Sequence, residues 1–529
     1  MNPLLYRRQF LLSPKPLPRL KAWQQADAGT YTLQVHPDCP LTRATSGNRT
    51  AMLVGYCLEP RVPKATNSDL AARMARSETL EGMAICLHGL SGRFLVFLSE
   101  PGLLRIYPDA CGLRSLFWTI RDRRFHAASQ PTLLGKAVPI TPSAAYEQYF
   151  GSEYVKIKPG HYHPAGVSLY ENVYQLVPNH FLEIKTGRST RNISRNPAGH
   201  QSGTLTEQKP QPASHPQKKM ADRVRHIRFY PTRTLSRISS EEGVDAFNAL
   251  LKGSLEAAAR RSSLALGLSA GLDSRLLLAA TGPKVYTYTL INRDPGLMYH
   301  DIHIPKALAA RLGFRHQCID TRKPLEPTFR AFYNANTDIP HSEHWGTQAQ
   351  AMKELFSNGL LAVKGDGAEI IRRYYYKYKR HPRITSHHHF VKMITGWKGI
   401  PFIDNAMLRW YEGVRPAADR TGHHVLDLFY WEHEMGGWMA RNQLEWDICQ
   451  EVFNPYSNRE LLEVGLGVDE RLRRLPDNTF FIRAIEKLWP ELLLDPIHPQ
   501  KTQSRHIRKR FKKLLMKVGL RRSKNTGRI

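Results

Sequence analysis

Long apolar runs and clustered cysteines are both missing from this 529-residue sequence. No stretch approaches the ~20 apolar residues that a membrane-spanning helix needs. Residues 1–8 lack the apolar core and small-residue cleavage site of a secretion signal. The six cysteines are far apart and form no Cys-x-x-Cys pair, which favours free thiols in a reducing compartment. These absences predict a cytoplasmic protein with no transmembrane segment and, at this length, two or three domains.

Acidic residues are scarce relative to basic ones. The sequence has 46 Asp and Glu against 76 Lys and Arg, a formal net charge of +30, and such an excess favours anionic partners. Part of it lies in residues 186–238, which are polar and have no apolar periodicity. They predict a disordered basic linker. Its charge fits a solvated spacer better than a nucleic-acid-binding arm, so nucleic acid is not the expected partner.

Residues 501–529 carry another part of the positive charge, with twelve Lys and Arg and no acidic residue. Apolar residues fall near helical spacing along this tail. A basic amphipathic tail of this kind predicts contact with a membrane surface or with a protein partner. The alternative is a solvated helix that has no partner.

The most informative motif is a turn of small residues after an apolar run. Residues 264–268 read Leu-Ala-Leu-Gly-Leu, which is typical of a buried parallel strand. The turn consists of Ser269, Ala270, Gly271, Leu272, Asp273 and Ser274. Small residues let the backbone approach an anion, and the N–H groups of a following helix point at it. A phosphate-binding loop is one interpretation; a helix N-cap at Ser269 or Asp273 is the other.

Two common phosphate-binding patterns are absent from this turn. It lacks the Gly-x-x-x-x-Gly-Lys-Ser/Thr pattern of the Walker loop. It has a single glycine where the dinucleotide-binding fingerprint needs three. If the loop binds phosphate, it therefore belongs to another class.

Strands and helices alternate from residue 239 onward. A helix is predicted from Ser239, strands at 264–268, 284–290 and 316–319, and a second helix from Asp301 to Leu312 that ends at Gly313. This order predicts a doubly wound parallel sheet. Ligands bind at the carboxyl ends of the strands in such sheets, where the small-residue turn lies.

A second turn follows another apolar strand. Residues 360–363, Leu-Leu-Ala-Val, lead into Lys364-Gly365-Asp366-Gly367-Ala368-Glu369. By itself this segment also fits an ordinary glycine turn. Two such turns at strand ends of one parallel sheet favour a shared nucleotide site.

The first turn resembles the pyrophosphate loop of the ATP pyrophosphatases, the family of asparagine synthetase, argininosuccinate synthetase and GMP synthetase. The second is similar to the Ser/Thr-Gly-x-Gly-Gly/Ser-Asp-Glu stretch of asparagine synthetase-like proteins. The resemblance implies that ATP and Mg²⁺ are bound at the two loops, with Asp273 and Glu369 as the metal ligands. It implies that Asp366 lies near the reacting carboxyl group, and that Lys501, or else Lys487, stabilises the transition state for adenylation.

The same resemblance implies which residues contact the nucleotide. They are Leu268, Ser269, Ala270, Gly271, Leu272, Asp273, Ser274, Leu290, Gly365 and Gly367. Four positions depart from the family pattern. They are Ala270 in place of Gly, Lys364 in place of a hydroxyl residue, Glu369 in place of Asp, and Ile370 in place of Glu.

Residues 1–185 alternate β-like runs with turns, and strands are predicted at 51–57, 84–88, 94–99 and 103–107. The segments at 92–118 and 155–180 resemble the glutamine amidotransferase domain of asparagine synthetases. That glutaminase uses a cysteine at position 2 as its nucleophile, where this sequence has Asn2. The resemblance implies a degenerate domain without glutaminase activity.

Two runs after the second loop carry unusual side chains. Residues 372–380 interleave Arg and Lys with Tyr, which could stack bases or bind phosphate. A solvated helix face over an aromatic core is the preferred interpretation, with Arg372 the nearest to the pocket. Metal binding by residues 387–389, three histidines, is not expected, because consecutive side chains point in different directions and no partner spacing is visible.

The expected fold class is α/β. An α+β Ntn-type sandwich over residues 1–185 and the linker precede a doubly wound ATP pyrophosphatase domain over 239–500, and the basic tail follows. The implied function is an ATP-dependent amide ligase that adenylates a small-molecule or peptide carboxylate and transfers it to an amine acceptor or ammonia. The alternative is a non-catalytic homologue that binds a nucleotide or a partner; Ala270, Lys364 and Ile370 favour it.

Overall fold

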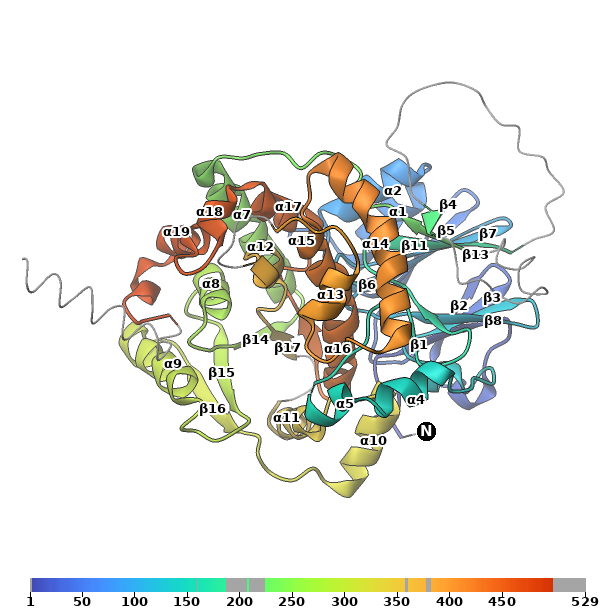
Figure 1. Ribbon diagram of the computed structural model, residues 1–529, viewed down its shortest axis with the longest axis horizontal. Helices are drawn as coiled ribbons and strands as arrows, with labels where there is room; N and C mark the ends of the chain where they lie inside the picture. Colours follow the sequence, from blue (N-terminus) through green and yellow to red (C-terminus); the bar gives the residue numbers. More distant parts are fainter. Residues whose placement is uncertain are drawn as a thin grey trace, which may run out of the picture.

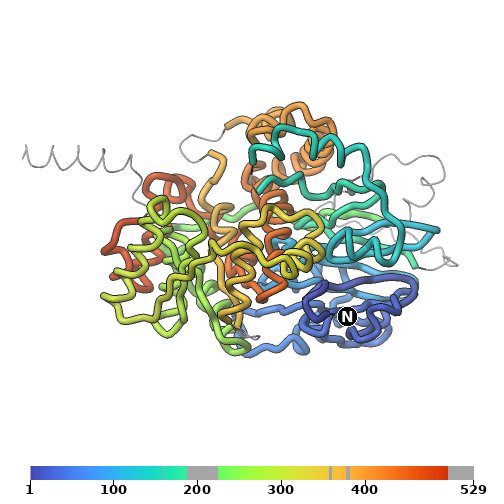
Figure 2. Tube along the Cα trace, turned by 90° about the horizontal axis from the view of Figure 1, so that it is seen from below, coloured from blue at the N-terminus to red at the C-terminus, as the bar shows by residue number. Residues whose placement is uncertain are grey.

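The computed structural model describes residues 2–158, 160–186, 207–208, 224–356, 360–376 and 382–497. They form a sandwich of two antiparallel sheets, followed by an α/β unit with one parallel sheet. Figure 1 shows the sandwich strands on the right and the parallel strands among helices on the left. The same two units are seen from below in Figure 2, where the amino-terminal chain, in blue, lies within the sandwich.

The sandwich is built from strands that alternate between two buried faces. Its first sheet has the order β10 (Tyr174–Gln175), β8 (Phe117–Arg121), β9 (Arg124–Ala128), β1 (Phe10–Ser13), β3 (Tyr31–Val35), β2 (Gln24–Ala28). Its second has the order β12 (Glu207–Gln208), β13 (Val224–Arg228), β11 (His180–Lys185), β7 (Leu103–Pro108), β6 (Ser91–Glu100), β5 (Arg49–Leu58), β4 (Leu41–Ser46). In β6, Leu95 and Phe97 fill the space between the sheets, while Phe94 and Val96 face the opposite core.

Short helices accompany the sandwich: η1 (Pro18–Leu20), α1 (Asn67–Arg76), α2 (Leu80–His88), α3 (Pro131–Leu134), α4 (Ala144–Phe150) and α5 (Glu153–Ile157). The prediction of a strand over residues 84–88 is wrong, because this segment ends α2. Thr79 caps α2 by accepting a hydrogen bond from the Gly82 N–H, and Met83 and Leu87, four residues apart, are buried.

The second unit contains five parallel strands in the order β16-β15-β14-β17-β18. Their bounds are β14 (Ser263–Gly267), β15 (Tyr286–Ile291), β16 (His316–Asp320), β17 (Leu360–Val363) and β18 (Glu451–Phe453). The chain adds two strands on one side of β14 and then crosses to add β17 and β18 on the other. The order therefore reverses between β14 and β17, and this is where such sheets bind ligands.

Both faces of the parallel sheet are buried, as in a doubly wound arrangement. Ala265 and Ala362 belong to one core, and Leu266 and Val363, the next residues along, belong to the other. Helices α7 (Ser240–Ala259), α8 (Leu272–Thr281), α9 (Tyr299–Leu312) and α19 (Thr479–Leu488) pack on the second of these faces. Helices α10 (Pro327–Thr337), α11 (Glu343–Leu355) and α16 (Ala440–Asp447) pack on the first.

The remaining helices lie after β17 and β18 in the chain. They are α12 (Ala368–Ile371), η2 (Tyr374–Tyr376), α13 (His388–Met393), α14 (Pro401–Thr421), α15 (Val425–Phe429), the π-helix η3 (Tyr430–Met439), α17 (Arg459–Gly467), α18 (Glu470–Arg473) and η4 (Pro490–Leu493). Together α15, η3 and α16 make a continuous helical run. It lies between the parallel sheet and the sandwich, and contacts both through Arg93–Asp447 and Arg228–Glu432 on one side and the core of the sheet on the other.

Buried ion pairs join the two units. Arg93 Nη2 of β6 lies 2.8 Å from Asp447 Oδ2 of α16, and Arg228 Nη2 of β13 lies 2.8 Å from Glu432 Oε2 of η3. All four side chains are at most 2% exposed. A charge buried in this way is tolerated only when it is paired, so the two units form one packed body.

The sandwich also covers β18, which lies at one edge of the parallel sheet. The Tyr56 hydroxyl of β5 donates to the Val452 carbonyl at 2.7 Å. Arg114 donates to both carboxylate oxygens of Glu451 at 3.0 Å. The edge strand is thus closed by side chains of the amino-terminal unit.

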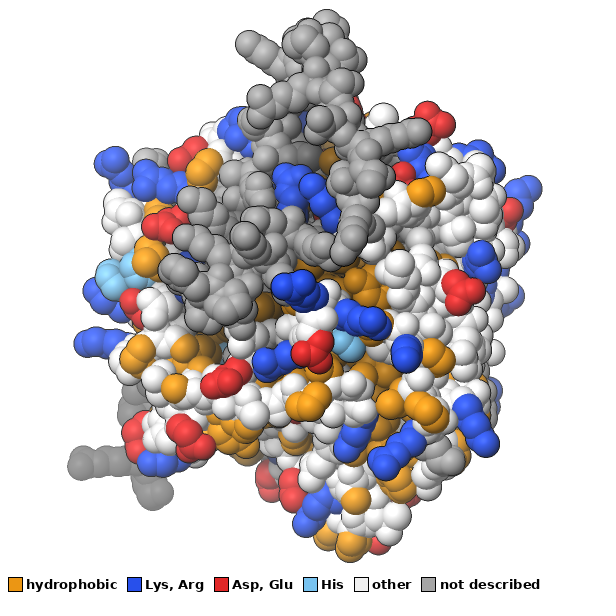
Figure 3. Space-filling view, turned by 90° about the vertical axis from the view of Figure 1, so that its right-hand side faces the viewer, with side chains coloured by type: hydrophobic (Ala, Val, Ile, Leu, Met, Phe, Trp, Pro, Cys, Tyr) orange, Lys and Arg blue, Asp and Glu red, His pale blue; other side chains and the backbone are white. Residues whose placement is uncertain are grey.

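The carboxyl end of the predicted linker differs from the sequence-based expectation. Residues 224–228 form β13, which pairs with β11, because Val224 and Ile227 are buried and join the sandwich cores. Most of the linker, at 187–206 and 209–223, lies outside the described residues, as does the basic tail. No helix in the described part of the chain is long and apolar enough to cross a membrane. Lys and Arg side chains are spread over the face shown in Figure 3.

Candidate active site

The two predicted loops lie side by side in the structure. β14 and β17 are paired, with Leu266 opposite Val363, so the segments after them leave neighbouring strand ends. A Cβ atom added to Gly365 would lie 3.2 Å from the Asp273 Cβ and 3.3 Å from the Ser274 N. The absence of a side chain at Gly365 therefore allows the second loop to contact the first turn of α8.

The loop before α8 is not closed by a side-chain cap. Gly271 is the N-cap residue and makes no side-chain capping bond, so the interpretation of Ser269 or Asp273 as the cap is wrong. The Ser274 Oγ instead accepts from the Ser269 N at 3.2 Å and lies 3.1 Å from the Ser269 Oγ. Asp301 Oδ1 accepts from the Ala270 N at 3.0 Å. These bonds shape the loop and leave the first turn of α8 without an acidic or hydroxyl cap.

A cavity of about 310 Å³ opens at these strand ends. The predicted residues that line it are Ser269, Gly271, Asp273, Ser274, Leu290, Gly365, Asp366 and Glu369. The side chains of Leu268, Ala270 and Leu272 instead point into the hydrophobic core, where each is at most 3% exposed. Gly367 has φ 102°, a left-handed conformation that favours glycine, and shapes the second loop rather than lining the cavity. Lys501 lies outside the described residues.

Arg372 bridges the two acidic residues that the resemblance assigns to a metal. Its Nη2 donates to Asp273 Oδ2 at 2.6 Å and lies 3.5 Å from Glu369 Oε1. Glu369 Oε2 accepts from the Gly367 N at 3.1 Å. Burial raises the pKa of Asp273 to about 7; Arg372 opposes this shift, and Glu369 and Asp366 add to it. These contacts agree with the expectation that, within residues 372–380, Arg372 lies nearest to the pocket.

Asp273 and Glu369 are also suitable for a magnesium ion. Asp273 Oδ1 is buried and, among the described atoms, has no hydrogen-bond partner. Carboxylate oxygens are the ligands that magnesium prefers, and it commonly uses only one or two of them alongside phosphate oxygens. The donor set therefore fits, and Arg372 would share the same carboxylates.

Lys364 and Asp366 place opposite charges on the second loop. The Lys364 Nζ lies 3.6 Å from the centre of the Trp446 ring and donates to Asn442 Oδ1 at 3.3 Å. Burial lowers the pKa of Lys364 to about 8, against the effect of Asp366. Burial raises the pKa of Asp366 to about 6, against the effect of Lys364. Both groups can therefore change protonation state close to neutral pH.

Three tryptophans also line the cavity. Trp345 comes from α11, Trp438 from η3 and Trp446 from α16, with Gln348 and Asn442 beside them. Sequence reasoning missed these residues. The only signal was the aromatic-rich stretch around 428–438. Two polar residues of this stretch pack elsewhere: Glu432 pairs with Arg228, and His433 accepts from the Ala165 N at 3.1 Å.

The surface position of Lys487 argues against its assignment to this cavity. It lies in α19, half exposed, and forms an ion pair with Asp245 of α7. Neither of these residues lines the cavity.

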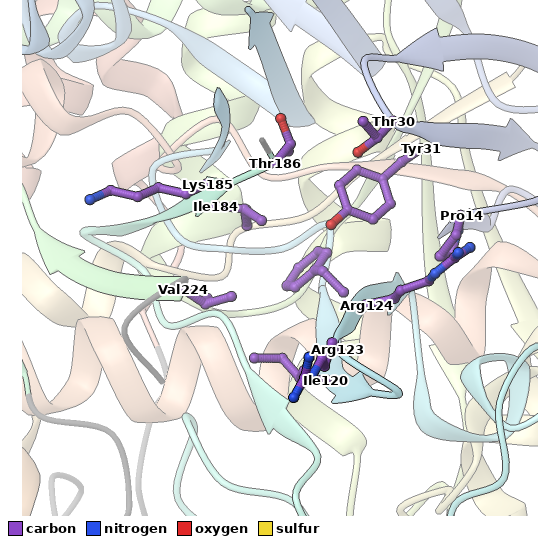
Figure 4. Close-up of a pocket in the computed structure, with 11 residues that line it drawn as sticks. Pro14, Thr30, Tyr31, Ile120, Arg123, Arg124, Ile184, Lys185, Thr186 and Val224 are labelled. Atoms are coloured by element: carbon purple, nitrogen blue, oxygen red, sulfur yellow. The ribbon is translucent and has the colours of Figure 1, made fainter. Parts of the chain in front are cut away.

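A second cavity, of about 330 Å³, lies at one end of the sandwich and is lined by Tyr31, Arg123, Arg124 and Lys185 among others. In Figure 4 the charged ends of Lys185 and Arg124 lie on opposite sides of it and do not converge. No acidic side chain lines this cavity in the described part of the chain. The clustered charges at the strand ends make the first cavity the stronger candidate.

Comparisons with known proteins find only weak structural similarities. No family model matches the chain, and no curated protein matches it. Among solved structures, it is similar to glutamine phosphoribosylpyrophosphate amidotransferase from B. subtilis complexed with ADP and GMP, with 11% identity, 70% of this chain and 73% of that chain covered, and a TM-score of 0.23. Another, described as the allosteric regulatory enzyme of purine biosynthesis, has 12% identity, 70% and 72% coverage and the same TM-score. Likenesses this weak carry no argument about this chain.

Proposed function

We propose that this protein is an ATP-dependent amide ligase of the asparagine synthetase type. It would adenylate a carboxylate and transfer the acyl group to an amine or to ammonia. The observation that carries the proposal is the meeting of two glycine loops, with three acidic residues and Lys364, at the point where the parallel sheet reverses its strand order.

The first loop is proposed to hold the phosphates of ATP. The uncapped first turn of α8 offers backbone N–H groups, and the Ser269 and Ser274 hydroxyls lie beside them in the cavity. Asp273 and Glu369 would hold a magnesium ion, which when bound neutralises phosphate charge. Arg372 would add a second positive charge next to these carboxylates.

The second loop is proposed to bind the substrate carboxylate and to accept the proton that the amine loses. An oxygen of the substrate carboxylate bonds to the α-phosphorus, and the bond from that phosphorus to pyrophosphate breaks. The amine nitrogen then bonds to the acyl carbon, and AMP leaves with the electrons of the broken C–O bond. Lys364 would pair with the substrate carboxylate, and Asp366 would accept the proton that the amine loses, as a base titrating near neutral pH does efficiently.

The proposal excludes glutaminase chemistry in the sandwich. A nucleophilic cysteine needs an accessible thiol with a lowered pKa. Burial raises the pKa of all four sandwich cysteines, to about 11 for Cys39 and about 12 for Cys111, and each except the partly buried Cys86 is fully buried. The amine would therefore come from solution or from the acceptor substrate.

ATP–pyrophosphate exchange in the presence of candidate carboxylic acids tests the proposal. The wild-type protein should exchange labelled pyrophosphate into ATP only with its acid, and Asp273→Asn should lower the exchange by about 100-fold or more. If no acid promotes exchange and the protein binds no ATP, the proposal is wrong.

A non-catalytic nucleotide-binding role is the second candidate. The observation that favours it is Arg372, which neutralises both acidic residues proposed to hold the metal. In that case ATP should bind with micromolar affinity by calorimetry, and Arg372→Ala should weaken it, while no acid promotes exchange.

A further inference from the structure

Three side chains with metal-binding atoms meet where α13 and α14 pack together. His387 Nε2 lies 3.4 Å from Asp404 Oδ2, and His388 Nδ1 lies 3.2 Å from Asp404 Oδ1. Each residue has one ligand atom within 4.8 Å of those of the other two, and no other such group of three occurs among the described residues. The cluster is separate from the cavity at the strand ends, because none of its members lines that cavity.

Adjacent histidines can converge here because they use different ring nitrogens. His387 presents Nε2, at the far end of its ring, and His388 presents Nδ1, next to its Cβ. The two ring centres are 4.0 Å apart. Asp404, in the first turn of α14, supplies the third atom from 16 residues along the chain. The sequence-based objection to a metal site, diverging side chains without a partner, does not hold in this fold.

The spacing and the chemistry of these atoms fit a transition metal. In a tetrahedral zinc site, bonds of about 2.0–2.2 Å place neighbouring ligand atoms about 3.4 Å apart. The two histidine nitrogens lie at similar distances from the Asp404 carboxylate, each from a different one of its oxygens. Two imidazole nitrogens and one carboxylate oxygen favour zinc, cobalt, nickel or copper over magnesium and calcium. Three protein ligands leave one position for water.

The cluster is open to solvent on one side and closed on the other. The His387 side chain is 12% exposed, that of Asp404 40% and that of His388 57%. An ion can therefore enter from solution and bind to His387, the least exposed of the three ligands. We propose that His387, His388 and Asp404 bind one divalent transition-metal ion, with zinc as the representative.

The proposed ion has a structural role. Phe390 of α13 is fully buried and packs against Trp410 of α14 at 5.1 Å and Phe429 of α15 at 4.9 Å, between ring centres. Asp404 belongs to the same α14, so an ion at the cluster holds α13 on the helices that lead into η3. This consequence does not depend on the proposed ligase function.

Zinc binding to the untagged full-length chain tests the proposal. Protein treated with a chelator and exchanged into chelator-free buffer is titrated with Zn²⁺ alone in a calorimeter and heated with and without it. The wild type should bind one more ion per chain than His388→Ala or Asp404→Ala. Each variant should weaken binding at this site by about tenfold or more, because loss of a ligand costs at least as much as loss of its supporting partner. Zinc should raise the midpoint of thermal unfolding of the wild type only.

His389→Ala is the matched control. His389 is exposed on the same short helix, and its ring faces Phe390 rather than the cluster. It should keep the wild-type stoichiometry, affinity and thermal shift. Equal zinc binding by the wild type and Asp404→Ala, with both folded by circular dichroism, would show that the three side chains only hydrogen-bond to one another. Loss of binding in His389→Ala would overturn the ligand assignment.

Discussion

Buried charges occur in two regions of this molecule, and they are arranged in opposite ways. Between the two units, close partners outweigh burial for Arg93, whose pKa neighbouring acids raise, and for Glu451, whose pKa neighbouring arginines lower, although burial still raises the pKa of Asp447. At the strand-end cavity, burial is the stronger effect and moves the pKa values of Asp273 and Lys364 toward neutrality. Perturbed pKa values of the kind found at the cavity are common at functional sites, whereas the interface charges lie in close ion pairs.

Breaking a pair between the units should have the largest effect. Glu432→Ala removes the partner of Arg228 and leaves a buried guanidinium without its carboxylate, which should cost about 3–5 kcal/mol of unfolding free energy. Urea unfolding of the variant and the wild type measures this loss of unfolding free energy. Asp320→Ala, which removes an exposed pair with Arg322, is the control and should leave the midpoint unchanged. Equal midpoints for the two variants would contradict the structural role of the buried pair.

Asp273→Asn should separate function from stability. If the carboxylate holds the metal–phosphate assembly, acid-dependent pyrophosphate exchange should fall by about 100-fold or more. The midpoint of urea unfolding near pH 7.5 should not fall, because the native state disfavours the Asp273 charge. A variant that loses stability and activity together would place Asp273 with the interface pairs instead.

Lys364→Met tests the positive charge of the second loop. Removing a charged partner of the substrate carboxylate should raise the KM for the acid by about tenfold or more, with little change in the KM for ATP. Lys487→Met, at the surface beside Asp245, should change neither constant. Steady-state kinetics at fixed ATP and then at fixed acid would measure both KM values. A raised KM for the acid in Lys487→Met but not in Lys364→Met would assign the substrate carboxylate to Lys487.

The raised pKa of Asp273 also makes the stability of the protein depend on pH. The folded pKa of Asp273, about 7, lies above the ordinary value of 3.8, so between these values the native state binds more protons than the unfolded state. Stability attributable to this group therefore falls as pH rises from 4 to 7 and is constant above. The gain in unfolding free energy on Asp273→Asn should be larger at pH 8 than at pH 5. An equal gain at both would show that the pKa is not raised.

Sequence reasoning found the parts of the site that are local in the chain. The loops at Ser269–Ser274 and Lys364–Glu369 combine small residues, acids and a preceding apolar strand within a few positions, and the structure brings them together. The parallel sheet was predictable for the same reason. The assignment of ATP and magnesium to the loops remains a proposal.

What sequence reasoning missed depends on distance along the chain. Arg93 and its partner Asp447 are 354 residues apart, and no local pattern connects them. Trp345 and Trp438 meet at 5.6 Å between ring centres only because α11 and η3 pack at the same end of the sheet. His387 and His388 needed Asp404 from another helix before they could be regarded as ligands.

The covering of β18 gives the sandwich a structural role toward the parallel sheet. An exposed edge of a parallel sheet offers free backbone groups to any other strand and invites aggregation. Tyr56 and Arg114 occupy that edge through Val452 and Glu451. The amino-terminal unit thus shields the β18 edge of the parallel sheet, whose other edge is β16.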